Sequence, residues 1–360
     1  MLYDRIEKQA GSREAVSSSE NETGRIDLPT PYLIFLGDVT EPGYAKTAFG
    51  LRDWATDKCV GEYALPEATV SAGLPQMTPA EAARQGARAL VIGVANTGGV
   101  IGDSWIPALL EALDAGLDIV SGMHTRVNAH PLLRERAMRL GRRMIDVREP
   151  PQGIPIGTGR KRSGNRLLTV GTDCALGKKY TALAIARGLQ KRGIDADFRA
   201  TGQTGIMIAG SGIPMDAVIS DFAAGAAEIL SPDAAPDHWD IIEGQGSLSH
   251  PAYSGVSLAL LHGSQPDVVV VCHDVGRAEL LGVPGYAVPP VEDMIDLNLR
   301  LGARTNPAIR CGGVAINTSS LSADEAAALL DREADRLGLP VADPVRGGAR
   351  FERLLDRCIG

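Results

Sequence analysis

The most informative stretch of the sequence is residues 167–182, where an apolar run leads into a glycine-bounded loop and the pair Gly177-Lys178. A strand, a loop and a helix in this order direct backbone N–H groups and a lysine ammonium at one point, which suits bound phosphate. We therefore predict that the following residues contact the phosphates of a ligand: Thr172, Asp173, Cys174, Ala175, Leu176, Gly177, Lys178, Lys179, Tyr180 and Thr181.

This phosphate loop (residues 171–179) departs in two ways from the pattern G-x-x-x-x-G-K-[ST]. Five residues instead of four separate Gly171 from Gly177, and Lys179 stands where a serine or threonine hydroxyl normally binds Mg²⁺. An ammonium group cannot ligate a cation, so we predict a phosphate site without metal. Two adjacent lysines suit the phosphates of coenzyme A.

Three titratable residues beyond the phosphate loop are candidates for proton transfer. Glu243 ends an apolar run, and the glycines that follow it at 244 and 246 let a ligand approach the backbone closely. His250 lies further along the same loop, and Asp221 lies in a helical pattern. A carboxylate that is shielded in a cleft can accept a proton, and so can an imidazole. A solvated carboxylate and a structural histidine are the alternative interpretations of Asp221 and His250.

The elements that must position these residues alternate between strands and helices. Apolar β-rich runs predict strands at 32–36, 59–63, 89–94, 118–121, 144–147, 167–170, 196–199, 240–243, 267–272 and 313–316. Helical patterns predict helices at 78–86, 105–115, 131–140, 178–192 and 324–337. Strands that alternate with helices form parallel sheets, so we predict an α/β fold. It comprises an N-terminal Rossmann-like domain and a C-terminal P-loop NTPase-like, doubly wound parallel sheet.

A segment rich in proline, glycine and basic residues, 149–165, separates the two series of strands. Proline fixes the backbone and removes a hydrogen-bond donor, which is typical of an extended linker. The predicted domains are a polar, flexible N-terminal arm at 1–25, a Rossmann-like domain at 26–150 and a P-loop domain at 151–360. Ligands of such sheets bind at the carboxyl ends of the strands, where the motifs described above occur.

Composition excludes several classes of function. The net charge is −8 and aromatic residues make up 4%, which argues against nucleic-acid binding. No apolar run approaches the ~18 residues of a membrane-spanning helix. The five cysteines have no C-x-x-C spacing and are expected to be reduced thiols. We therefore expect a cytoplasmic protein. We also expect a homo-oligomer that acts on a small molecule.

The phosphate loop, read as Gly-Thr-Asp-x-x-x-Gly-Lys, resembles that of dethiobiotin synthetases and their amidoligase relatives. A second resemblance covers more of the chain. Four motifs occur in an order that resembles a bacterial family long described as a domain of unknown function, at residues 171–179, 201–205, 216–225 and 243–251. Some members of that family are D-glutamate N-acetyltransferases. The resemblance covers about residues 30–358 and implies acetyl-CoA as co-substrate.

The resemblance also directs attention to residues that could bind the amino acid. It implies ligand contacts for Gln203 and Thr204, while Ser247 lies in the loop of Glu243. An acidic amino acid needs cationic groups, and Arg277 can bind a carboxylate through two parallel hydrogen bonds. The first half of the chain offers Lys46, His124 and Arg126. For each residue alone, a structural role is the alternative.

We predict an N-acetyltransferase that moves the acetyl group of acetyl-CoA to the amine of an acidic D-amino acid, D-glutamate above all, in D-amino-acid catabolism. Glu243, helped by Asp221 or His250, is the predicted base, and Cys174 is not expected to be a nucleophile. The second hypothesis is an ATP- and Mg²⁺-dependent carboxylase or amidoligase, against which Lys179 argues. The third is a non-enzymatic nucleotide-binding regulator.

Overall fold

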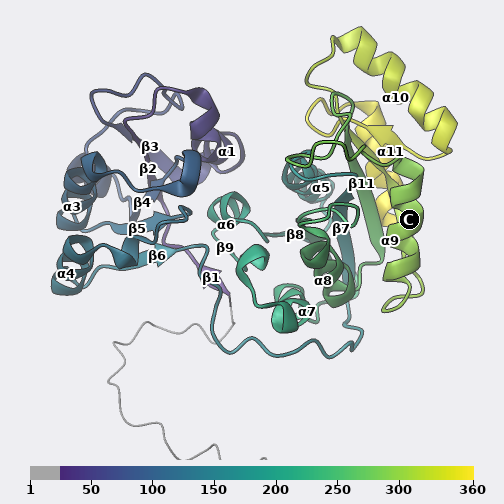
Figure 1. The fold of residues 1–360 in the computed structure, drawn as a ribbon, viewed down its shortest axis with the longest axis horizontal. Coiled ribbons are helices and arrows are strands. Elements are labelled where there is room, and N and C mark those ends of the chain that lie inside the picture. The colour runs from purple at the N-terminus through teal and green to yellow at the C-terminus, as the bar shows by residue number, and fades with distance from the viewer. Residues whose placement is uncertain (1–24) are drawn as a thin grey trace, which may run out of the picture.

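The computed structural model describes residues 25–360 and contains two parallel β-sheets that belong to different halves of the chain (Figure 1). The predicted N-terminal arm lies outside the described residues, except for Arg25. None of the described helices is long and apolar enough to cross a membrane.

The N-terminal sheet has five parallel strands in the order β3-β2-β4-β5-β6. Its strands are β2 (Tyr32–Gly37), β3 (Cys59–Ala64), β4 (Ala89–Ile92), β5 (Asp118–Ser121) and β6 (Met144–Asp146). Its helices are α1 (Lys46–Trp54), α2 (Pro79–Arg84), α3 (Ile106–Asp114) and α4 (Pro131–Leu140). The central strands β2, β4 and β5 are buried along their whole length, which explains their continuous apolar runs.

The C-terminal sheet has six parallel strands in the order β13-β12-β11-β7-β10-β8. Its strands are β7 (Asn165–Gly171), β8 (Ala196–Arg199), β10 (Trp239–Ile242), β11 (Val268–Asp274), β12 (Arg310–Asn317) and β13 (Val341–Ala342). Its helices are α5 (Lys178–Lys191), α6 (Gln203–Ala209), α7 (Ser220–Leu230), α8 (Ser254–Ser264), α9 (Val291–Gly302), α10 (Ala323–Leu337) and α11 (Ala349–Ile359). Helices α5 and α11 share one apolar core with the sheet, and α7, α8 and α9 share another.

The predicted α/β class with a Rossmann-like sheet and a P-loop sheet is confirmed. Each predicted strand and helix has a counterpart within a few residues, and the capping box at Ser322 and Glu325 begins α10. Asp216 lies in a single 3-10 turn, Met215–Ala217, ahead of α7, and not in an α-helix. Other 3-10 turns are Pro42–Ala45, Thr56–Lys58, Thr97–Gly99, Asp103–Trp105 and Val127–Ala129.

Helix α6 belongs to the C-terminal half of the chain but packs on the N-terminal domain, beside α1 (Figure 1). Its residues Ile206, Met207 and Ile208 are buried in the same apolar core as β2 and β4. Next to it, β1 (Ile26–Asp27) pairs antiparallel with β9 (Ser211–Gly212). The two halves of the chain therefore share a hydrophobic core at α6.

Candidate active site

The phosphate loop joins β7, in the middle of the C-terminal sheet, to α5. Lys178 is almost fully buried, and its Nζ donates a hydrogen bond of 2.7 Å to the carbonyl of Asp173 within the loop. Burial lowers the pKa of this ammonium. The N–H groups of residues 175–177 donate to no acceptor in the described part of the chain. Together with the N-terminus of α5, they form a site with several free donors for an anion.

The shape of the loop is held by Asp173, which is fully buried. Its Oδ1 accepts the N–H of Cys174, and its Oδ2 accepts Arg277 Nη1 at 2.9 Å and the N–H of Leu281 at 2.8 Å. Burial by itself would raise the pKa of Asp173, but these donors together lower it. The carboxylate is therefore charged and tied to the segment that follows β11. Arg277 itself is engaged within the protein, although we expected it to bind the substrate.

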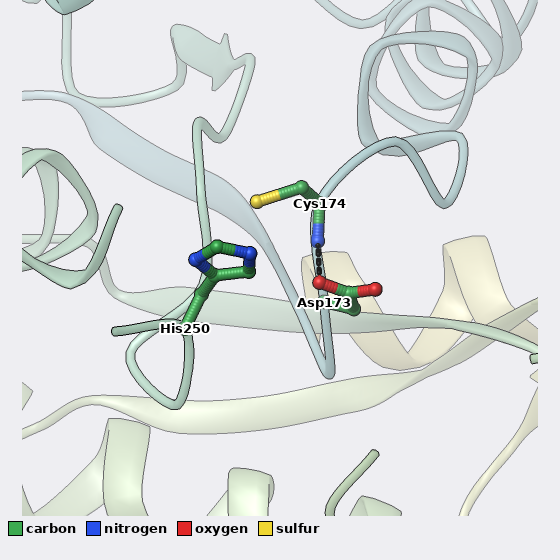
Figure 2. A group of neighbouring side chains, drawn as sticks. All are labelled: Asp173, Cys174 and His250. Atoms are coloured by element: carbon green, nitrogen blue, oxygen red, sulfur yellow. Dashed lines mark hydrogen bonds between the residues drawn. The ribbon is translucent and has the colours of Figure 1, made fainter. Parts of the chain in front are cut away.

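Asp173, Cys174 and His250 bring a carboxylate, a thiol and an imidazole together, with the ligand atoms within 4.8 Å of one another (Figure 2). Figure 2 shows the Cys174 thiol turned toward the His250 ring. Two of these three groups are already in use: Asp173 holds the loop, and His250 accepts the N–H of Ala252 at Nδ1 while Nε2 donates to the carbonyl of Leu281. A metal ion would have to displace these hydrogen bonds.

The thiol of Cys174 is a poor nucleophile in this arrangement, because burial raises its pKa. His250 has both ring nitrogens engaged, which leaves no lone pair to accept a proton from a substrate. The ring of Tyr253 packs on His250, with 4.7 Å between the ring centroids. These contacts support a structural role for His250.

Glu243 follows β10 and lies between the ends of β7 and β8. Its side chain is almost fully buried, and Oε2 accepts the N–H groups of Thr201 at 2.9 Å and Gly202 at 3.1 Å, at the start of α6. The other oxygen, Oε1, receives no hydrogen bond from the residues that the structure describes. Burial raises the pKa of Glu243, opposed by Lys179, by the two N–H groups and by the Thr201 hydroxyl. A carboxylate with one free oxygen and a raised pKa is suited to general-base catalysis.

Two glycines allow the backbone to approach this carboxylate closely. A methyl group on Gly205 of α6 would overlap Glu243 Oε2, and one on Gly244 would overlap the carbonyl of Thr169 in β7. The N–H of Gly244 also binds the Thr169 hydroxyl at 3.0 Å. The glycines after and opposite Glu243 therefore set its position against β7 and α6.

Lys179, the residue at the usual metal-ligand position, is the cation that faces Glu243. Burial lowers its pKa, and the negative charge of Glu243 opposes that effect. Its Nζ lies 4.6 Å from the centroid of the Tyr180 ring, which stacks on Trp54 of the N-terminal domain. Tyr180 therefore contacts the other domain. Leu176 is also directed inward, into the core beneath α5.

The predicted substrate residues fall into three groups. Lys46, His124 and Arg126 are exposed at the carboxyl edge of the N-terminal sheet, where Arg126 lies 3.5 Å from Glu149. Ser247 is buried and binds the carbonyl of Gly171. Gln203 and Thr204 lie on α6 and contact the N-terminal domain, where the Thr204 hydroxyl is 3.2 Å from that of Thr47.

Among the described residues, no hydrogen bond or ion pair connects Asp221 to the phosphate loop. It is exposed in the first turn of α7. Its location supports a solvated role, the alternative interpretation considered from the sequence.

Two residues of the N-terminal domain, Arg148 and Trp54, contact elements of the site that sequence reasoning did not connect with them. Arg148 Nε donates to the carbonyl of Gly122, and its Nη1 is 2.8 Å from Asp216 of the other half of the chain. The Trp54 ring contacts both the Tyr180 ring and the Arg187 guanidinium of α5. The position of Arg148 just after a predicted strand, at the same sheet edge as Gly122, was the available signal.

The fold and site together define a two-domain α/β protein with a Rossmann-like sheet and a P-loop sheet joined through α6. Residues 58–150 match DUF1611_N, a domain of unknown function described as Rossmann-like, and residues 155–355 match DUF1611, described as a P-loop domain. The chain belongs to the DUF1611 family.

Two curated relatives cover almost the whole chain. It is 49% identical over 329 residues to a D-glutamate N-acetyltransferase of Tritonibacter scottomollicae, covering 91% of this chain and 98% of that protein. It is 46% identical over 323 residues to a D-glutamate N-acetyltransferase of a Pseudoalteromonas species, covering 90% and 97%. The crystal structure of a DUF1611 family protein from Anabaena variabilis is similar, with a TM-score of 0.79, 32% identity, and coverage of 91% and 99%.

Proposed function

We propose that this protein is a D-glutamate N-acetyltransferase that moves the acetyl group of acetyl-CoA to the amine of D-glutamate. The two curated relatives carry that activity in their names and match about nine tenths of the chain at nearly half identity. The observation within this structure that supports it most is Glu243, a buried carboxylate with one free oxygen beside the phosphate loop. Acetyl transfer to an ammonium requires such a base.

Acetyl-CoA is the donor that suits the phosphate loop. The free N–H groups of residues 175–177, the N-terminus of α5 and the Lys178 ammonium would bind phosphate oxygens. Lys179 adds a second positive charge where other phosphate loops have a hydroxyl for Mg²⁺. We propose that Lys179 replaces the charge of a metal ion at this position.

In the proposed reaction, Glu243 Oε1 accepts a proton from the ammonium of D-glutamate. The neutral amine attacks the thioester carbonyl carbon, a C–N bond forms, and the C–S bond breaks. The second amine proton passes to the departing thiolate of coenzyme A as the tetrahedral intermediate collapses, and the protonated Glu243 then releases its proton to solvent. Backbone N–H groups near the phosphate loop are the candidate donors for the oxyanion. The thioester is already activated, so no acyl-enzyme intermediate is needed.

The amino acid is proposed to bind at the carboxyl edge of the N-terminal sheet. Lys46, at the start of α1, and His124 and Arg126, in the loop after β5, are exposed there. Lys46 and Arg126 offer positive charge to the two carboxylates of the substrate, and His124 offers a ring N–H donor. Asp221 and His250 are secondary in this proposal, since one is exposed and the other has both nitrogens engaged.

The test is a free-thiol assay with purified protein, acetyl-CoA and D-glutamate in the presence of EDTA, with L-glutamate and D-aspartate as controls. The proposal predicts thiol release with D-glutamate that does not depend on a divalent cation. Release of ADP or phosphate from ATP and Mg²⁺, with no thiol release from acetyl-CoA, would instead favour an ATP-dependent ligase. Ligand binding without any turnover would favour a regulator.

A further inference from the structure

Arg148 forms a three-way contact between the two halves of the chain. It follows β6, and its Nε donates to the carbonyl of Gly122, after β5, at 2.8 Å. Its Nη1 donates to Asp216 Oδ2 at 2.8 Å. Its Nη2 lies 2.9 Å from the side-chain amide oxygen of Gln203, in the amide orientation that satisfies both groups of Gln203. In this orientation the Gln203 amide nitrogen donates to the same Gly122 carbonyl.

Gln203 is the first residue of α6, the helix whose start holds the proposed base. The N–H groups of Thr201 and Gly202 bind Glu243 Oε2, and Gly205, one turn into the helix, lies against the same oxygen. A displacement of α6 would therefore move or break the hydrogen bonds that place Glu243. The link from Arg148 to the carboxylate passes through the Gln203 side chain and the two residues that precede it, Thr201 and Gly202.

The other end of α6 is also held by the N-terminal domain. Lys58 Nζ donates to the carbonyls of Ile208 at 2.8 Å and Ala209 at 2.7 Å, and the Tyr32 hydroxyl donates to the carbonyl of Met207 at 3.1 Å. These contacts anchor the C-terminal end. The N-terminal end, next to Glu243, depends on Arg148 and on the contact between Thr204 and Thr47.

We propose that Arg148 is a positioning residue for acetyl transfer, which fixes the start of α6, and with it Glu243, relative to the loop after β5. That loop begins at Gly122 and carries His124 and Arg126, so the contact sets the distance between the base and the proposed amino-acid site. This inference rests on the proposed function. Arginine suits the role because its planar guanidinium directs separate donors at three acceptors, which a lysine ammonium cannot reproduce.

The experiment compares Arg148→Ala and Arg148→Lys with the control Arg350→Ala, which removes a partly exposed arginine that pairs with Asp331 far along the chain. We expect kcat to fall about 100-fold for Arg148→Ala, the scale of a displacement of about 1 Å at a reacting group. We expect a smaller loss of kcat for Arg148→Lys than for Arg148→Ala. The Kd for acetyl-CoA should stay within about 2-fold, because Arg148 does not contact the phosphate loop. The control should retain full kcat.

The pH profile separates positioning from general loss of structure. The N–H groups of Thr201 and Gly202 lower the pKa of Glu243, so loosening α6 should move the acidic limb of kcat to higher pH. Lys179 on α5 is the charged side chain of the described residues that faces Glu243, and these variants leave it unchanged. A second variant, Gln203→Ala, should shift the same limb. The fold-loss of kcat in the double variant, Arg148→Ala with Gln203→Ala, should be smaller than the product of the two single fold-losses, because both side chains act through the same contact.

Hydrogen–deuterium exchange of residues 201–209 provides a readout that needs no turnover. Exchange should accelerate in Arg148→Ala and stay unchanged in Arg350→Ala. Normal kcat in Arg148→Ala, an unmoved acidic limb, or unchanged exchange in α6 would each overturn the positioning role. If the unaltered protein releases no thiol from acetyl-CoA, the proposed function fails, and accelerated exchange would then support Arg148 as an anchor of α6 alone.

Discussion

Replacement of Glu243 by glutamine is the sharpest perturbation of the proposed mechanism. Glutamine has nearly the same volume, and its Oε1 can accept the N–H groups of Thr201 and Gly202 as the carboxylate does now. What it lacks is a basic oxygen at the position of the free Glu243 Oε1. The variant should therefore fold normally and bind acetyl-CoA but fail to deprotonate the amine.

The expected loss follows from the role of the group. A positioned general base contributes ~10²–10⁴-fold to rate, so kcat should fall by that factor, equivalent to about 3 to 5 kcal/mol of activation free energy. The KM for acetyl-CoA should change little, because Lys178 and the loop N–H groups remain. A loss confined to kcat would identify an interaction that matters in the transition state.

The free energy of unfolding should not fall in Glu243→Gln, because burial destabilises the ionised carboxylate. Burial raises the pKa of Glu243 above its usual value of 4.5, so the folded state holds the proton more tightly than the unfolded state. The carboxylate therefore costs stability above pH 4.5, and this cost grows until the pH passes the raised pKa. At a pH above the raised pKa, Glu243→Gln should be at least as stable as the unaltered protein. Below pH 4.5, Glu243 is protonated in both the folded and the unfolded state, and the stability cost of its charge should vanish.

The assay is free-thiol release with D-glutamate across a pH series, with thermal unfolding of the same samples. Glu243→Asp serves as a matched control, since it keeps a carboxylate on a shorter side chain and should retain more activity than glutamine. The reasoning is refuted if Glu243→Gln has near-normal kcat at neutral pH. It is also refuted if the acidic limb of the unaltered enzyme is the same in Glu243→Gln.

Three further predictions concern the phosphate loop, the N-terminus and the histidine. Lys178→Ala should weaken acetyl-CoA binding at least 10-fold by calorimetry with EDTA present, and undiminished affinity would remove Lys178 from the site. Deleting residues 1–24 should leave the melting temperature and kcat unchanged, whereas deletion through Asp27 removes β1 and should lower the melting temperature. His250→Asn should keep kcat within about 10-fold yet lower stability, because it loses a part-buried hydrogen bond to Leu281 worth about 0.5–1.5 kcal/mol; a 1,000-fold loss of kcat would restore His250 as a base.

Much of the fold could be predicted because its strands are buried on both faces. Strands such as β4 and β11 read as continuous apolar runs, and the phosphate loop follows one of them in the usual order. The strands β1, β9 and β13 have two residues each, too few to show a pattern. Helix α6 has seven residues, and its apolar side packs on the other domain, so its role was not evident from sequence.

The site was predicted less completely, since the sequence does not show which polar groups satisfy one another. Glu243 could be predicted because it ends an apolar run and is followed by glycines at 244 and 246. Arg277 appeared free to bind a substrate, but the structure pairs it with the buried Asp173. The family resemblance implies a ligand contact for Gln203, and the structure places its side-chain amide against Arg148 across the domain boundary. The partners of Arg277 and Gln203 lie about 55 to 100 positions away in the chain. Local sequence patterns do not show contacts over such separations.

The central claim is that the phosphate loop holds acetyl-CoA and that Glu243 accepts the proton of the amino acid. A crystal structure with coenzyme A and N-acetyl-D-glutamate tests it most directly. We predict the phosphates of coenzyme A on the N–H groups of residues 175–179 and on Lys178, and the amide nitrogen of the product within hydrogen-bond distance of Glu243 Oε1. Coenzyme A bound away from the phosphate loop, or a product amide distant from Glu243, would contradict the account.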